Sequence, residues 1–192
     1  MEAREFWLKF QEKIEEHREA LEKRWLKDKA FTKSIKQVIT EIIKEKYPSE
    51  NFVVQPEYYN IDIVGWEQKK SEKKEYLLKE DEYLFEKYAW NFSVAVEHEN
   101  KKELWMDEVV KLAYIYCDLR VVIGYFPYKI KEKQQSYLNE VASVLAGLGC
   151  RENLKSGDFL VILGDVDGDR TDGFGRLVYT PYLYRDGTFS PL

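Results

Sequence analysis

The sequence has few of the residues that define several common protein classes. Among 192 residues it contains only 2 cysteines, 2 histidines and 5 prolines. Cys117 and Cys150 each lie in an apolar stretch and do not form a Cys-x-x-Cys pair. We therefore expect reduced core thiols, and neither a zinc site nor a disulfide framework.

Long apolar runs and a basic excess are also missing. No run approaches the ~18 apolar residues of a membrane-spanning helix, and the start, MEAREFWLKF, is too charged for a signal peptide. We therefore expect a cytoplasmic protein that does not enter the membrane. Lys and Arg total 30 against 35 Asp and Glu, a net charge of −5. A polyanionic substrate would thus need a local basic patch or a divalent cation.

What the chain does have is enough apolar material for a core. Hydrophobic residues make up 44% and aromatic residues 15%, and the length predicts a single domain over 1–192. Residues 1–30 are expected to be an N-terminal extension formed by one helix at 2–28. Its narrow apolar stripe, in which we expect His17 to be a packing residue, either packs across the domain or joins a second copy in a homodimer.

The remaining pattern predicts an α/β chain with a mixed sheet of the α+β type. In the central region, 32–126, the expected elements are a helix at 32–47 capped by Thr32, strands at 51–55 and 60–66 with a turn at 56–59 between them, an exposed insertion at 67–88, a strand at 91–99, a helix at 103–117 and a buried strand at 119–126. In the C-terminal region, 127–192, they are a helix at 133–148, a strand at 158–165 and terminal strands around an Asp186-Gly187 turn.

Three carboxylates stand out within the predicted strands. Glu97 and Glu99 are two residues apart on one strand, so they project from the same face, about 7 Å apart at their Cα atoms. Asp62 interrupts the apolar strand that is expected to pair antiparallel with this one. Together these carboxylates predict a site for Mg²⁺ or Mn²⁺, although Glu99 also fits a solvated loop position.

The arrangement resembles the PD-(D/E)xK, or restriction-endonuclease-like, nuclease superfamily. The resemblance rests on Asp62, on Glu97-His98-Glu99, and on the helix and strand that follow. It implies a restriction-endonuclease-like core with flanking helices, an N-terminal helix addition and a C-terminal hairpin addition. It also implies a magnesium-dependent nuclease acting on nucleic acid, with DNA as the first expectation. Asp62 and Glu97 would then be metal ligands, and Glu99 a further ligand or the base.

The sequence departs from the family pattern in three places. No Pro-Asp pair occurs, and Glu57, which follows a proline, is a rival for the first acidic position. The two acidic positions are 35 residues apart, which requires the insertion to loop out. Glu99 stands where the family usually has lysine. Lys111 and Lys101 are the candidates to replace that lysine, although Lys111 also has Asp107 four residues earlier as a partner on a solvated stripe.

Other acidic groups have simpler explanations. In the family a carboxylate from the preceding helix often assists the site, and Glu41 or Glu45 is available, but solvated helix positions explain both. The segment 165–173 resembles a calcium loop, yet Arg170 and Arg176 stand where that loop needs Gly and Glu.

Three functional hypotheses follow from the sequence. The first is a metal-dependent phosphodiesterase. The second is a catalytically inactive nuclease-like scaffold that binds nucleic acid or protein. The third is an interaction module centred on the first helix.

Overall fold

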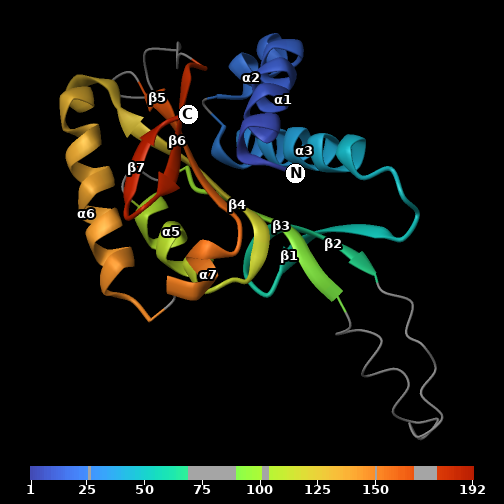
Figure 1. Cartoon of the computed structure of the whole chain (residues 1–192). Helices are drawn as coiled ribbons and strands as arrows, with labels where there is room; N and C mark the ends of the chain where they lie inside the picture. Colours follow the sequence, from blue (N-terminus) through green and yellow to red (C-terminus); the bar gives the residue numbers. More distant parts are fainter. Residues whose placement is uncertain (26, 69–89, 101–103, 150, 167–176) are drawn as a thin grey trace, which may run out of the picture.

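A seven-stranded mixed sheet forms the centre of the molecule, with helices on both faces (Figure 1). The computed structural model describes residues 1–25, 27–68, 90–100, 104–149, 151–166 and 177–192. The strands are β1 (Phe52–Tyr58), β2 (Ile61–Gln68), β3 (Trp90–His98), β4 (Cys117–Pro127), β5 (Asp158–Val166), β6 (Tyr179–Arg185) and β7 (Thr188–Pro191). The helices are α1 (Ala3–Glu16), α2 (Arg18–Arg24), α3 (Asp28–Lys46), α5 (Trp105–Ala113), the 3₁₀ helix η1 (Tyr128–Lys133), α6 (Gln134–Gly147) and α7 (Arg151–Lys155).

The strands lie in the sheet in chain order. β3, β4 and β5 are parallel to one another, and every other neighbouring pair is antiparallel. The helix α5 connects β3 to β4, and α6 and α7 lie between β4 and β5 in the chain. The expected α/β class with a mixed sheet is therefore confirmed.

Two hydrophobic clusters lie on opposite faces of the sheet. On one face α1, α2 and α3 cover alternate strand residues, and on the other face α5 and α6 cover the residues between them. Val121 and Val122 are neighbours on β4, and each belongs to a different cluster. A strand whose consecutive side chains are all buried must have both faces covered, as the apolar run 119–126 predicted.

The N-terminal segment differs from the single helix expected at 2–28. It forms α1 and α2 with a break at His17, whose φ and ψ of −98° and 5° are not helical. The apolar residues Phe6, Phe10 and Leu21 of the stripe are fully buried against the sheet of the same chain. A homodimer through this stripe therefore finds no support. His17 is partly exposed, and its Nε2 lies 3.2 Å from Glu41, which brings it against α3.

The β1–β2 hairpin is longer and tighter than the sequence predicted. β1 continues through residues 56–58, within the turn that the sequence predicts at 56–59, because β1 is an edge strand and tolerates the missing N–H of Pro56. The turn itself is formed by Tyr59 and Asn60 with φ of 48° and 62°. Positive φ at both central residues is typical of a type I′ turn, whose twist suits a two-residue hairpin. Glu57 also has a positive φ, of 53°.

The helix α5 is shorter than the predicted 103–117 and lies close against β4. It ends at Ala113 because β4 already begins at Cys117, and the residues between them must turn. Trp105, at its first turn, lies directly over Gly124, where a Cβ would be 2.4 Å from the Trp105 Cβ. Glycine at this position therefore lets the helix approach the strand.

The other boundaries agree more closely with the sequence. α3 begins at Asp28, so Thr32 lies inside the helix rather than at its cap. The C-terminal strands and the turn at Asp186-Gly187 are confirmed. Cys117 is a free, buried thiol, and burial raises its pKa to about 11, in line with an inert core residue. Residues 69–89, which make up most of the predicted insertion, and Cys150 lie outside the described residues.

None of the helices in the described ranges combines the length and the apolar character that crossing a bilayer requires.

Candidate active site

Asp62 and Glu97 face each other across two neighbouring strands. The register that pairs Ile63 with Val96 makes them the next opposed positions, at the start of β2 and near the end of β3. Each carboxylate accepts a backbone hydrogen bond from the opposite strand: His98 N–H donates to Asp62 Oδ2 at 2.9 Å, and Asp62 N–H donates to Glu97 Oε2 at 3.3 Å. The two carboxylates are therefore fixed side by side at one edge of the sheet.

Glu97 is the more deeply buried of the two acidic residues. Its side chain is 4% exposed, against 18% for Asp62. Burial and the nearby Asp62 carboxylate outweigh the favourable contact with Lys111 and raise the pKa of Glu97 to about 7. A carboxyl group with its pKa near neutrality carries a proton that an incoming cation can displace, which is a common property of functional sites.

Lys111 reaches this pair from α5. Its Nζ lies 2.7 Å from Glu97 Oε1, forms a second ion pair with Glu108 and donates to the Asn60 carbonyl at 3.0 Å. Although burial opposes the charge, these carboxylates raise the pKa of Lys111 above its usual value, so it stays an ammonium. The expected alternative partner, Asp107, does not appear among these ion pairs.

Lys36, which the sequence analysis did not single out, reaches the same pair from α3. Its Nζ lies 2.7 Å from Asp62 Oδ1 and also pairs with Glu57. Burial lowers the pKa of Lys36, but hydrogen bonds to Asp62 and Glu57 raise it by more. Since α3 and α5 cover opposite faces of the sheet, the two acidic residues are held between lysines from both sides. Glu57, the rival for the first acidic position, joins Lys36 beside Asp62 rather than replacing it.

His98 lies between the two acidic positions of the motif in sequence but points to the other face of the sheet. Its ring lies on the α3 side, 6.2 Å from the Phe31 ring, and its Nε2 is 2.9 Å from Tyr125 Oη. Burial lowers its pKa to about 3, so the ring is neutral. The His98 side chain therefore belongs to the core, while its backbone N–H serves the site.

The remaining candidates have different positions. Glu99 follows the end of β3, and its backbone N–H donates to Ile123 O at 2.9 Å. Lys101 lies outside the described residues.

Glu41 and Glu45, the candidate carboxylates on α3, contact the N-terminal helices instead. Glu41 contacts His17 and Gln37, and Glu45 pairs with Lys9 and Lys13 of α1. These contacts fix α1 and the start of α2 against α3, so the structure does not bring Glu41 or Glu45 to the acidic pair.

The segment that resembles a calcium loop is described only at its start. Asp165, on β5, is buried and pairs with Lys131 of η1 at 2.7 Å, while residues 167–176 lie outside the described residues. Within the described ranges no three His, Cys, Asp or Glu side chains are grouped to hold a metal ion. The candidate site consists of the adjacent carboxylates of Asp62 and Glu97 and of two lysines, each of which also pairs with a further glutamate, Glu57 or Glu108.

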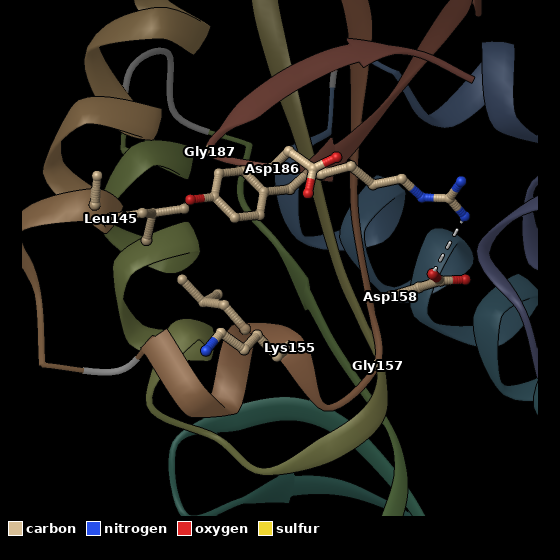
Figure 2. A pocket seen from close by; sticks show the side chains of 10 residues that line it. Leu145, Lys155, Gly157, Asp158, Asp186 and Gly187 are labelled. Carbon is tan, nitrogen blue, oxygen red and sulfur yellow. Dashed lines mark ion pairs between the residues drawn. The ribbon is translucent and has the colours of Figure 1, made fainter.

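A cavity of about 590 Å³ lies at the opposite edge of the sheet (Figure 2). It is lined by Lys155 of α7, Asp158 at the start of β5 and the Asp186-Gly187 turn, among other residues, and Arg185 pairs with Asp158 at 3.9 Å. β5 is parallel to β3, so the start of β5 and the end of β3 lie at opposite edges. The cavity is therefore separate from the Asp62–Glu97 pair.

No protein-family model matches the chain, and no curated protein matches it either.

Proposed function

We propose that the chain is a magnesium-dependent phosphodiesterase that hydrolyses nucleic acid. The observation that carries the proposal is the cross-strand pair of Asp62 and Glu97, held between Lys36 and Lys111 from opposite faces of the sheet. A carboxylate pair supplies hard oxygen ligands, and lysines beside it supply positive charge for a phosphate.

The residues present fit a divalent cation. The two lysines contact four carboxylates, those of Glu57, Asp62, Glu97 and Glu108, which leaves a formal charge of −2 when all are ionised. Magnesium typically binds through one or two protein carboxylates, with waters and substrate phosphate completing its shell. Asp62 and Glu97 would hold it. When bound, the metal supplies Lewis-acid polarisation of the phosphate and lowers the pKa of water.

The groups around the carboxylate pair have separate roles in the proposed reaction. Lys111 and Lys36 oppose negative charge that develops on the phosphate, because both are ammonium groups within 2.7 Å of the carboxylates that would bind the cation. The hydrogen bonds from the backbone N–H groups of Asp62 and His98 hold both carboxylates in place. Glu99 remains the candidate for a further ligand or for the base, and Lys101 for the motif lysine if Lys111 does not serve.

The order of elements supports the same proposal. The chain from α3 to β4 runs helix, three antiparallel strands, helix and parallel strand, and the acidic pair lies on the second and third strands. This order is compatible with the restriction-endonuclease-like core that the sequence resembles. The N-terminal helices and the strands β5 to β7 would then be additions to that core.

The direct test uses the purified chain on mixed DNA and RNA, single-stranded and duplex, with magnesium, manganese or a chelator. The proposal predicts metal-dependent cleavage that is lost in Glu97→Gln and in Asp62→Asn. Asp165→Asn, which changes another buried carboxylate paired with a lysine, is the matched control and should cleave like the parent.

One observation favours a second function, a catalytically inactive scaffold that binds nucleic acid or protein. Both carboxylates are already paired with lysines, and among the described residues no three His, Cys, Asp or Glu side chains are grouped to hold a metal ion. A metal titration separates the two. A scaffold without catalysis would show the same thermal midpoint with and without millimolar magnesium or manganese.

A further inference from the structure

An exposed tyrosine stands at the tip of the β1–β2 hairpin, next in sequence to a residue that contacts the site lysine Lys111. Tyr59 is 69% exposed. The next residue, Asn60, accepts a hydrogen bond through its carbonyl from Lys111, the lysine that pairs with Glu97. Consecutive Cα atoms are about 3.8 Å apart. The Tyr59 backbone is therefore only one residue away from the Asn60 carbonyl that Lys111 contacts.

Tyr59 has a backbone conformation that tyrosine rarely adopts. Its φ of 48° is a left-handed conformation, which Asn and Gly adopt easily and which is unusual for a bulky side chain. Residues held in such conformations cluster at functional sites, where the side chain has a role that offsets the strain.

The Tyr59 ring also packs against a neighbouring aromatic side chain. Tyr58 contacts it edge to face with the ring centroids 4.7 Å apart, and Tyr58 in turn lies 5.3 Å from the Trp66 ring in the core. A side chain supported in this way loses little conformational entropy when a ligand covers its outer surface.

We propose that Tyr59 is a stacking platform for an unpaired base of single-stranded nucleic acid bound at the Asp62–Glu97 site. The inference rests on the proposed function and adds a substrate class to it. Every base has a π face that stacks on an aromatic ring. In a duplex both faces are already covered by neighbouring bases, whereas an unstacked base in a single strand is available. The ring binds the base while the lysines contact the backbone phosphate.

The test measures binding of fluorescent 12-mers to the full chain by anisotropy, in calcium, with a gel to check that the strands stay intact. The probes are single-stranded DNA, single-stranded RNA, a DNA duplex and an abasic deoxyribose-phosphate oligomer. Tyr59→Ala should weaken binding of single strands by about 5- to 100-fold, which is the usual effect of losing one stacked base. Binding of the duplex and of the abasic oligomer should not change, and Tyr59→Trp should keep the parent affinity.

Two further variants separate stacking from misfolding and from general surface effects. Tyr59→Asn suits the left-handed turn, so it should show the same loss of single-strand binding with an unchanged or raised thermal midpoint. Tyr116, 67% exposed just before β4 and so at the opposite edge of the sheet, is the matched control, and Tyr116→Ala should bind like the parent. Weaker binding of single-stranded DNA, of single-stranded RNA or of both by the Tyr59 variants supports the inference. The strand that is affected shows whether the stacked base belongs to DNA or to RNA.

Two results overturn it. If the parent binds and cleaves nucleic acid but Tyr59→Ala and Tyr59→Asn match it on single strands, or lose as much on the abasic oligomer, Tyr59 is not a stacking platform and the proposed function stands. If the parent neither binds nor cleaves any of the probes, the inference and the proposed function fail together.

Discussion

Within the part of the chain that the structure describes, two buried carboxylates each lie 2.7 Å from a lysine, and their surroundings differ. Glu97 and Asp165 are 4% and 6% exposed, and their partners Lys111 and Lys131 are similarly accessible. Glu97, however, has a second carboxylate directly opposite, and its lysine is shared with Glu108. Burial next to a lysine is therefore not what distinguishes the proposed site. The distinguishing feature is the carboxylate on the neighbouring strand, since Asp62 lies opposite Glu97 whereas Phe126 lies opposite Asp165. The crowded pair of carboxylates leaves negative charge for a cation.

The largest difference between the two pairs should appear when their lysines are removed. Lys111→Ala should reduce turnover by roughly 10²–10⁴-fold, since it removes charge that opposes the developing phosphate charge, and should leave metal binding nearly intact. Lys131→Ala should turn over like the parent. Steady-state kinetics with a metal titration checks both. If Lys111→Ala cleaves like the parent, Glu99 or Lys101 has the role instead.

Metal ions should stabilise the crowded pair. Saturating magnesium or manganese should raise the free energy of unfolding by about 1–3 kcal/mol, because a ligand that binds only the native state adds its binding free energy. Asp62→Asn should lose most of this increase, and Asp165→Asn should keep it. Thermal denaturation with and without metal measures this increase in each variant. If Asp62→Asn and Asp165→Asn gained the same stability from metal, the cation would bind at another place than the Asp62–Glu97 pair.

The pH dependence of stability should report on Glu97. Because its pKa is raised to about 7, the native state binds more protons than the unfolded chain between about pH 4.5 and 7. Stability should therefore fall by about 3 kcal/mol as pH rises through this window in the absence of metal. Glu97→Gln should flatten that part of the curve, whereas Tyr116→Ala should not. Urea denaturation at several pH values would contradict this account if the parent curve were already flat.

The smallest expected effect concerns the hairpin turn. Replacing Tyr59 by Asn should raise the free energy of unfolding by about 0.5–1 kcal/mol, because the left-handed conformation no longer strains a bulky side chain. Tyr116→Asn is the control, with no such gain expected. Denaturant titration distinguishes the two, and a loss of stability in Tyr59→Asn would mean that the contact of this ring with Tyr58 outweighs the strain.

The sequence revealed the acidic pair because a carboxylate inside an apolar strand is a local signal. Asp62 and Glu97 both interrupt or end such strands, and the antiparallel pairing that brings them together follows from the strand order. Lys111 became a candidate through the resemblance, because Glu99 stands at the usual lysine position and Lys111 lies on the helix that follows. These residues depend on short-range patterns, and the structure brings all three together.

Other features depend on contacts between distant segments. Lys36 lies on a helix rich in lysine, and no local pattern indicates which of them faces the start of β2. The turn at Tyr59 and Asn60 was missed because Pro56 suggested an earlier turn, while an edge strand accommodates the proline. The break between α1 and α2 at His17 contains no proline or glycine, so the sequence does not indicate it.

The central claim is that Asp62 and Glu97 form a metal-dependent catalytic pair and that other buried carboxylates do not. The most direct measurement compares magnesium-dependent cleavage of single-stranded nucleic acid by the parent, Glu97→Gln and Asp165→Asn at equal concentration, each checked for folding by circular dichroism. We predict cleavage by the parent and by Asp165→Asn, and a loss of at least about 10³-fold in Glu97→Gln. Cleavage by folded Glu97→Gln at the parent rate, or no metal-dependent cleavage by the parent, would contradict the claim.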